Sequence, residues 1–191
     1  MQTKFMMDRE TQLMKAAFAV FSRYGVSKTT VGDIAAEAGV SRQTMYNLYG
    51  GRDEILRAAV EFVATENRAE VMRAWKTAGS LDEKLSIFCE AGPLAWYDAI
   101  HTSPHAADLI DGLHTVAKAQ LDLSDAAWIA AIAEQIEAHC GTVAGGYSAL
   151  EVADLFYVAA AQAKYRADNR SQLEIRLGVL KRSILALLGA R

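Results

Sequence analysis

Apolar residues recur at spacings of three and four along most of this chain, and this spacing places them on one face of an α-helix. The first such stripe contains Leu13, Ala17, Val20, Phe21 and Tyr24 and ends before Gly25. It predicts a helix over residues 8–24 that packs on the elements following it. No segment alternates apolar and polar residues as a half-buried strand does, so an all-helical fold is expected.

The next stretch predicts two short helices joined by a tight turn. Thr30 and Asp33 have the spacing of a capping box at the start of the first helix. Gly39 is suited to end that helix because glycine adopts the left-handed conformation at little steric cost. Ser41 follows directly and is a good N-cap for the second short helix.

This second helix, expected over residues 42–48, exposes an unusual set of side chains. Met45 and Leu48 are three apart and are predicted to face inward. The other side carries groups that bond base edges and phosphates, namely Arg42, Gln43, Thr44, Tyr46 and Asn47. A helix-turn-helix places such a helix in the major groove of DNA. DNA binding is therefore favoured over an ordinary helical corner with a solvated polar face.

The segment from Leu13 to Ile55 resembles the DNA-binding domain of the TetR family of one-component transcriptional regulators. The resemblance lies in LMKAAFAVFSRYG, TTVGDIAAEAGVS and TMYNLYGGRDEIL, about a quarter of the chain. It implies that Tyr46 bonds a phosphate and that Tyr49 packs at the exit of the motif. The residues expected at DNA are Lys28, Thr30, Ser41, Arg42, Gln43, Thr44, Tyr46, Asn47, Tyr49 and Arg52.

Two positions depart from the family pattern. The family commonly has lysine where Gly50 stands, and histidine or tyrosine where Leu48 stands. Loss of these backbone contacts predicts weaker nonspecific binding and a salt slope smaller by about one unit for each lost phosphate contact. Arg52 is expected to replace the lysine in part.

Helix caps and apolar stripes predict a larger helical body after residue 50. Capping boxes at Ser80–Glu83, Ser148–Glu151 and Ser171–Glu174, and Pro104 as a first helical residue, mark four helix starts. Helices are expected near residues 52–75, 81–100, 104–120, 124–140, 149–167 and 171–188, with a loop over residues 139–147. The predicted fold is all-α with about nine helices. It divides into a helix-turn-helix domain over residues 1–50 and a ligand-binding and dimerisation domain over residues 51–191.

The last two predicted helices have the pattern of an association surface. Leu173, Leu177, Leu180, Ile184 and Leu187 form an a/d seam over two heptads. The preceding helix carries Val152, Phe156, Ala159, Ala160 and Ala163, most of them small enough to allow close approach of a second helix. A homodimer through residues 149–188 would place two heads one DNA turn apart. The alternative is that both stripes fill the core of the body.

Aromatic and histidine residues gather between residues 81 and 140, as in a mostly apolar small-molecule site. Trp96, Tyr97, His101 and Trp128 are the candidate ligand-binding residues; the alternative, which helical spacing favours for any one of them, is a place in the core. His101 and His105 have a metal-binding spacing, but Pro104 between them argues for a break. No metal, cofactor or catalytic motif is therefore predicted, and the chain is not expected to be an enzyme.

The overall net charge of −3 does not favour nucleic acid, but its distribution does. Residues 1–50 carry six Lys or Arg against four Asp or Glu, and the remainder carries fourteen against nineteen. No run approaches the roughly 18 apolar residues of a membrane span, and no signal-peptide core is present, so a cytoplasmic location is expected. Cys89 and Cys140 lack metal or redox-motif spacing and are expected to be buried thiols.

These observations predict a ligand-responsive transcriptional regulator. It would bind a palindromic DNA operator as a homodimer, act as a repressor, and be released by a small-molecule effector. The alternative is a helical small-molecule-binding or interaction protein with impaired DNA binding, which the residues Leu48 and Gly50 suggest.

Overall fold

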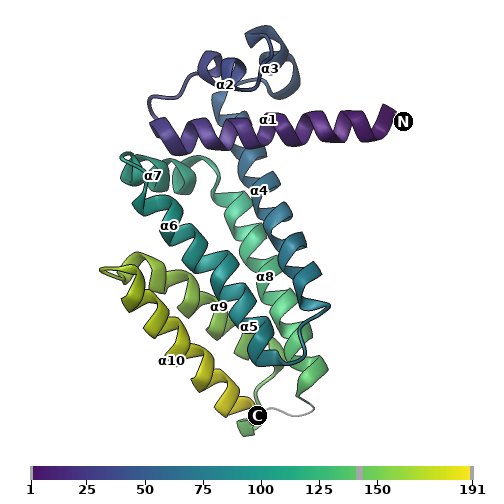
Figure 1. Cartoon of the computed structure of the whole chain (residues 1–191), viewed down its shortest axis with the longest axis vertical. Helices are drawn as coiled ribbons and strands as arrows, with labels where there is room; N and C mark the ends of the chain where they lie inside the picture. Colours follow the sequence, from purple (N-terminus) through teal and green to yellow (C-terminus); the bar gives the residue numbers. More distant parts are fainter. Residues whose placement is uncertain (1, 141–143, 190–191) are drawn as a thin grey trace. The chain divides into compact units, whose positions relative to one another are not determined.

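The computed structural model describes residues 2–140 and 144–189, without the side chains of residues 2–8 and 144. Regular structure within these ranges is entirely helical, which confirms the all-α class (Figure 1). The helices are α1 (Gln2–Tyr24), α2 (Val31–Glu37), α3 (Arg42–Tyr49), α4 (Arg52–Trp75), α5 (Leu81–Cys89), the π-helix η1 (Glu90–Leu94), α6 (Ala95–His101), α7 (Ala106–Val116), α8 (Lys118–His139), the short 3-10 helix η2 (Ala144–Gly146), α9 (Ala149–Arg166) and α10 (Arg170–Leu188). No described helix is both long and apolar enough to cross a membrane.

The chain forms two compact units, each built from segments that are distant in sequence. Unit 1 contains residues 1–66 and 100–124, and unit 2 contains residues 67–99 and 125–191. This grouping places α7 in the same unit as the helix-turn-helix. The functional division expected at residue 50 stays a prediction.

Unit 1 has its core on the predicted stripe of α1. Leu13, Ala17, Val20 and Phe21 are at most 3% exposed, and α2 and α3 lie together beside this helix (Figure 1). The prediction was wrong for Tyr24, which is 45% exposed at the end of α1. Its ring packs instead under the guanidinium of Arg23, 5.7 Å from the centroid. The helix also begins at Gln2 rather than near residue 8.

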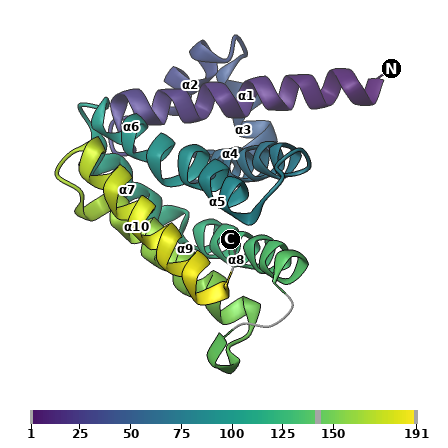
Figure 2. The same cartoon turned by 60° about the horizontal axis from the view of Figure 1, so that its bottom comes forward.

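Unit 2 is organised around Phe88. Its ring centroid lies 5.1 Å from that of Trp128, 5.7 Å from that of Phe156 and 5.9 Å from that of Tyr157. α9 and α10 lie side by side against this core (Figures 1 and 2). Most of the leucine seam of α10 is buried in it, since Leu173, Leu177 and Ile184 are at most 3% exposed, while Leu180 and Leu187 pack against it.

Two of the predicted helix caps are present and two predicted starts were wrong. Ser80 and Ser148 accept hydrogen bonds from the N–H groups of residues 83 and 151. The N-cap of α10 is Asn169, two residues before the predicted cap Ser171, because the Asn169 side chain accepts from the N–H of Gln172 at 2.9 Å. α7 begins at Ala106, after Pro104 rather than at it.

The middle of the chain breaks at other residues than predicted. α7 and α8 are separated only at Ala117, which is fully buried and carries no glycine or proline signal, rather than between residues 120 and 124. Residues 81–101 are continuously helical as expected, but widen to a π-helix around Pro93. The Asn67 amide donates to the carbonyl of Ala91 there at 3.0 Å. Of the predicted loop over residues 139–147, residues 141–143 lie outside the described part, and residues 144–146 form η2.

Candidate DNA-binding surface

The helix-turn-helix of unit 1 is held by side-chain caps at both of its helix starts. Thr30 Oγ1 accepts from the Asp33 N–H at 3.2 Å, and Asp33 Oδ2 accepts from the Thr30 N–H at 2.9 Å, which completes the predicted capping box. The Thr30 hydroxyl also donates to Asp33 Oδ2 at 2.7 Å, and this hydrogen bond together with that from the Thr30 N–H lowers the pKa of Asp33. Gly39 ends the turn with a left-handed φ of 66°, and Ser41 Oγ accepts from the Thr44 N–H at 3.0 Å to begin α3.

The exposed face of α3 carries two polar pairs, each four residues apart. Arg42 donates to the Tyr46 hydroxyl at 3.2 Å and lies over its ring, 5.5 Å from the centroid. Gln43 Nε2 donates to Asn47 Oδ1 at 2.8 Å. Neighbours at this spacing lie on the same helix surface. The pairs therefore hold four hydrogen-bonding side chains along one surface of α3, while Met45 is fully buried behind them.

Leu48 does not face inward as predicted, since 57% of its surface is exposed. It lies four residues after Thr44 and so shares the outer surface of α3 with that residue. The spacing of three from Met45 suggested burial, but a helix of eight residues has one buried apolar position here. An exposed leucine at this position can make apolar contact with a thymine methyl group.

The remaining predicted DNA contacts surround α3 in three different settings. Lys28 and Thr30 are exposed before α2. Tyr49 is half-buried, and burial together with Glu10 raises its pKa. Arg52 forms an ion pair with Asp53 at 3.0 Å. Such surface pairs contribute about 0–1 kcal/mol, so a phosphate can compete with Asp53 for Arg52.

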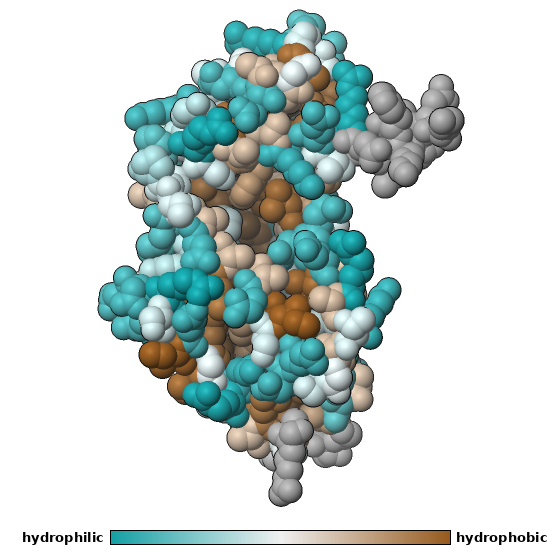
Figure 3. Space-filling model, in the orientation of Figure 1, coloured by the Kyte–Doolittle hydropathy of each residue, from teal (hydrophilic) through white to brown (hydrophobic). Residues whose placement is uncertain are grey.

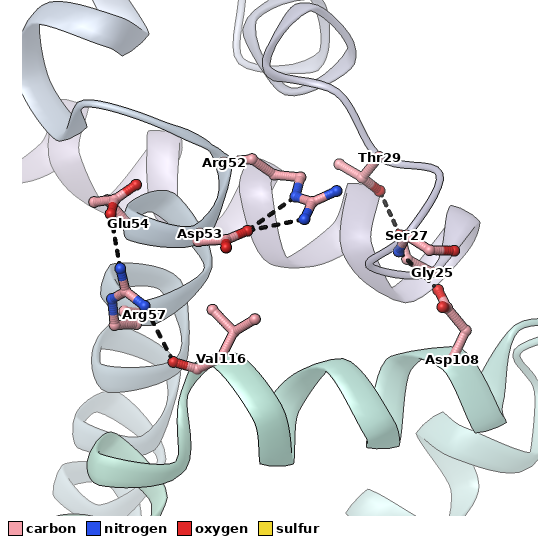
Figure 4. A network of polar contacts seen from close by, with 9 residues as sticks. All are labelled: Gly25, Ser27, Thr29, Arg52, Asp53, Glu54, Arg57, Asp108 and Val116. Carbon is pink, nitrogen blue, oxygen red and sulfur yellow. Dashed lines mark hydrogen bonds and ion pairs between the residues drawn. The ribbon is translucent and has the colours of Figure 1, made fainter.

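The turn between α1 and α2 is fastened to α7 within the same unit. Asp108 Oδ2 accepts from the Ser27 N–H at 3.0 Å (Figure 4), and this hydrogen bond lowers the pKa of Asp108. A Cβ on Gly25 would lie 2.1 Å from Asp108 Oδ2, and a Cβ on Gly112 would lie 2.5 Å from Val26. Both glycines are thus required for this close approach, which no sequence motif indicated.

The four predicted ligand-binding residues lie in different settings. Tyr97 and Trp128 are buried in the core of unit 2, where Trp128 packs edge-on against Phe88. Trp96 is half-buried, and the Lys164 ammonium lies 5.1 Å from its ring centroid. His101 is exposed and belongs to unit 1. Trp96 and Tyr97 are adjacent on α6 and Trp128 lies on α8; the role of these residues toward a ligand stays a prediction.

Unit 2 also carries an exposed apolar face on α9 and α10. It consists of Leu155, Val158, Ile175 and Val179, which are 48–63% exposed. Figure 3 shows apolar residues at the molecular surface over this region. The predicted association seam points mostly into the core, so these four exposed residues of the two helices are the candidates for contact with a partner.

No cluster of metal-binding side chains occurs in the part of the chain that the structure describes. Cys89 is buried as predicted, and burial raises its pKa to about 12. Cys140 is half-buried, and both thiols are free.

Comparison with known proteins connects this surface to a family. Residues 13–59 match the family described as bacterial regulatory proteins of the tetR family. A transcriptional repressor of Mycolicibacterium smegmatis, LfrR, is 33% identical over 89 residues, 44% of this chain and 46% of that protein. An uncharacterized regulator of Bacillus subtilis, YezE, is 28% identical over 86 residues, 45% of this chain and 44% of that protein. The matches thus span less than half of these curated relatives.

Solved structures match the fold over nearly the whole chain. A TetR transcription regulator from Haloarcula marismortui has a TM-score of 0.73 at 16% identity, over 95% of this chain and 98% of that one. A putative TetR-family regulator from Rhodococcus sp. has a TM-score of 0.71 at 18% identity, over 94% of this chain and 98% of that one. The sequence match confirms the resemblance to this family for the helix-turn-helix, and the solved structures show the same fold over the rest of the chain.

Proposed function

We propose that this chain, a TetR-family protein by its helix-turn-helix and its fold, is a ligand-responsive transcriptional regulator that represses by binding a DNA operator. The observation that supports this best is α3: a capped helix with one buried anchor and an outer surface of Arg42, Gln43, Thr44, Tyr46 and Asn47. Its relatives are named as regulators of transcription, and we propose no catalytic activity. A regulator of this kind acts in the cytoplasm, where bacterial DNA lies.

The side chains on α3 have distinct roles in this proposal. Arg42 and Gln43, at the start of the helix, read base edges, because arginine pairs with guanine and glutamine with adenine. The Tyr46 hydroxyl, which Arg42 already orients, bonds a phosphate. Leu48 contacts the bases through its exposed side chain. Lys28 and Thr30 hold the DNA backbone before α2.

The proposed operator complex contains a homodimer formed through α9 and α10. The apolar face Leu155, Val158, Ile175 and Val179 supplies the contact, replacing the leucine seam predicted from sequence. Complete burial of such a side chain contributes about 1.5–3 kcal/mol. Effector binding in unit 2 then favours a dimer conformation whose heads no longer match the operator, which releases the DNA.

Footprinting on the DNA that flanks the chain's own gene tests this proposal. The expected result is two protected half-sites related by twofold symmetry, with centres about 34–36 Å or a multiple of this apart. Protection of a single half-site would contradict the dimer mechanism.

The second candidate function is a helical carrier or interaction protein that no longer binds DNA. The exposed Leu48 and the glycine at position 50 favour it, since both stand where the family commonly has backbone-binding side chains. Joint replacement Arg42→Ala and Tyr46→Ala separates the two functions. A regulator loses DNA binding and keeps its effector affinity, whereas a carrier shows no DNA binding before or after the change.

A further inference from the structure

Lys164 lies near the end of α9 with its ammonium group against aromatic rings. Its Nζ is 5.1 Å from the ring centroid of Trp96 on α6 and 5.1 Å from that of Tyr165. It follows the buried Tyr157 by seven residues, about two helical turns. Its side chain therefore leaves α9 on the side that faces the core of unit 2, and Lys164 is half-buried there.

Two other half-buried lysines of unit 2 have polar side-chain partners. Lys181 forms an ion pair with Asp82 at 2.8 Å, and Lys84 donates a hydrogen bond to the neutral amide of Gln135 at 2.7 Å. Among the side chains of residues 9–140 and 145–189, no carboxylate forms an ion pair with Lys164. Asp125 acts on it only at longer range, and its carboxylate accepts the Tyr157 hydroxyl at 2.5 Å.

Burial has a measurable consequence for this amine. It lowers the pKa of Lys164 to about 8 and outweighs the opposing effect of Asp125. The amine is therefore still protonated at neutral pH, in surroundings that disfavour an isolated charge.

A second donor lies at the same place. The Trp96 Nε1 atom is buried and has no partner at hydrogen-bond geometry in the described chain. Burial raises the pKa of Tyr165, and the nearby indole N–H opposes this shift without meeting the geometry of a hydrogen bond to the phenol oxygen. Buried donors of this kind are normally paired with an acceptor.

We propose that Lys164 and Trp96 bind the carboxylate of an organic acid that has an apolar body. One cation and one neutral donor match a single negative charge, whereas a phosphate dianion requires more donors. The flanking rings favour an apolar body over a small, strongly hydrated anion. This inference rests on the proposed function, because it names the chemical class of the effector.

The test is calorimetric titration of the full chain with benzoate and with octanoate, each beside its neutral amide. At pH 7 at least one acid is expected to bind about tenfold or more tightly than its amide, the discrimination of a charge-assisted contact. Preferential binding of benzoate would indicate an aromatic body in the effector, and preferential binding of octanoate an aliphatic one. Its affinity is expected to fall about tenfold between pH 7 and pH 9, as the amine loses its proton.

Two variants make the test specific. Lys164→Met keeps the apolar stem and is expected to abolish the preference for acid over amide. Lys181→Met removes a half-buried but paired lysine of the same unit and is expected to leave the preference unchanged. Three results would each overturn the proposal. They are equal binding of acid and amide to the unaltered chain, no binding of either acid at about 10 mM, and a preserved preference for the acid in Lys164→Met.

A DNA-binding assay run in parallel distinguishes rejection of the Lys164 site from rejection of the proposed regulator function. Specific DNA binding without acid binding leaves the regulator intact and rejects the Lys164 site. Acid binding without DNA binding rejects the regulator and supports a carrier that uses the same site.

Discussion

Unit 1 and unit 2 are both built from α-helices, yet the residues of their candidate functional sites are distributed differently along the sequence. The candidate DNA-binding surface of unit 1 consists of consecutive residues of α3, whose N-cap Ser41 accepts from the N–H three residues later. The candidate effector site of unit 2 combines Trp96 of α6 and Lys164 of α9, two residues that are 68 positions apart in the sequence. A local surface can be recognised in the sequence, whereas a site assembled by packing cannot.

The largest effect is expected where unit 2 exposes apolar residues. Ile175→Glu combined with Val179→Glu should weaken self-association by at least about 100-fold, because an unpaired buried carboxylate costs several kcal/mol. Analytical ultracentrifugation measures the dimer fraction. Leu123→Glu changes a leucine that is 70% exposed in unit 1 and serves as the matched control. A dimer that survives the double change would show that the interface lies elsewhere.

A smaller effect is expected at the contact of α7 with the α1–α2 turn. Gly112→Ala places a Cβ 2.5 Å from Val26, and overpacking of this kind costs about 1–3 kcal/mol. Urea denaturation should show a lower free energy of unfolding. Because the clash is with the Val26 side chain, adding Val26→Gly should restore part of the lost free energy of unfolding. If the destabilisation of the double variant equals the sum of those of the two single variants, Gly112 does not act through Val26.

Removal of the α3 cap should cost less. Ser41 Oγ accepts from the Thr44 N–H at 3.0 Å, and loss of an N-cap costs about 1 kcal/mol. Ser41→Ala is expected to lower the thermal midpoint, and Ser41→Asp to restore it. The outcome that would contradict this cap is an unchanged midpoint for the alanine variant.

The smallest expected effect depends on pH. The hydrogen bond from Ser27 lowers the pKa of Asp108 in the folded state, so its contribution is present above the unfolded pKa, about 4, and is lost as the pH falls through the folded value. The free energy of unfolding of Asp108→Asn should therefore differ from that of the unaltered chain at pH 7 and approach it at pH 3. A difference that is constant over this range would exclude the charge of Asp108 as the cause.

The same contrast explains which features were predictable. The caps at Thr30 and Ser41 and the buried stripe of α1 involve neighbours in sequence, and these predictions are confirmed. Leu48 was assigned to the wrong side, and the stripe of α10 could not be divided between a core and an association surface, because spacing defines a face but not what covers it. The contact between Asp108 and Ser27 joins residues 81 positions apart, which no local pattern records.

The central claim is that the outer surface of α3 reads DNA, and a salt series of DNA binding tests it most directly. The predicted result is tight binding of two chains to one palindrome near the chain's own gene, with log affinity falling steeply against log salt, by about 0.9 for each phosphate contact. Arg42→Ala with Tyr46→Ala should remove this specific binding while the fold is kept, because both side chains are exposed. Weak binding that is indifferent to sequence and unchanged in that variant would contradict the claim.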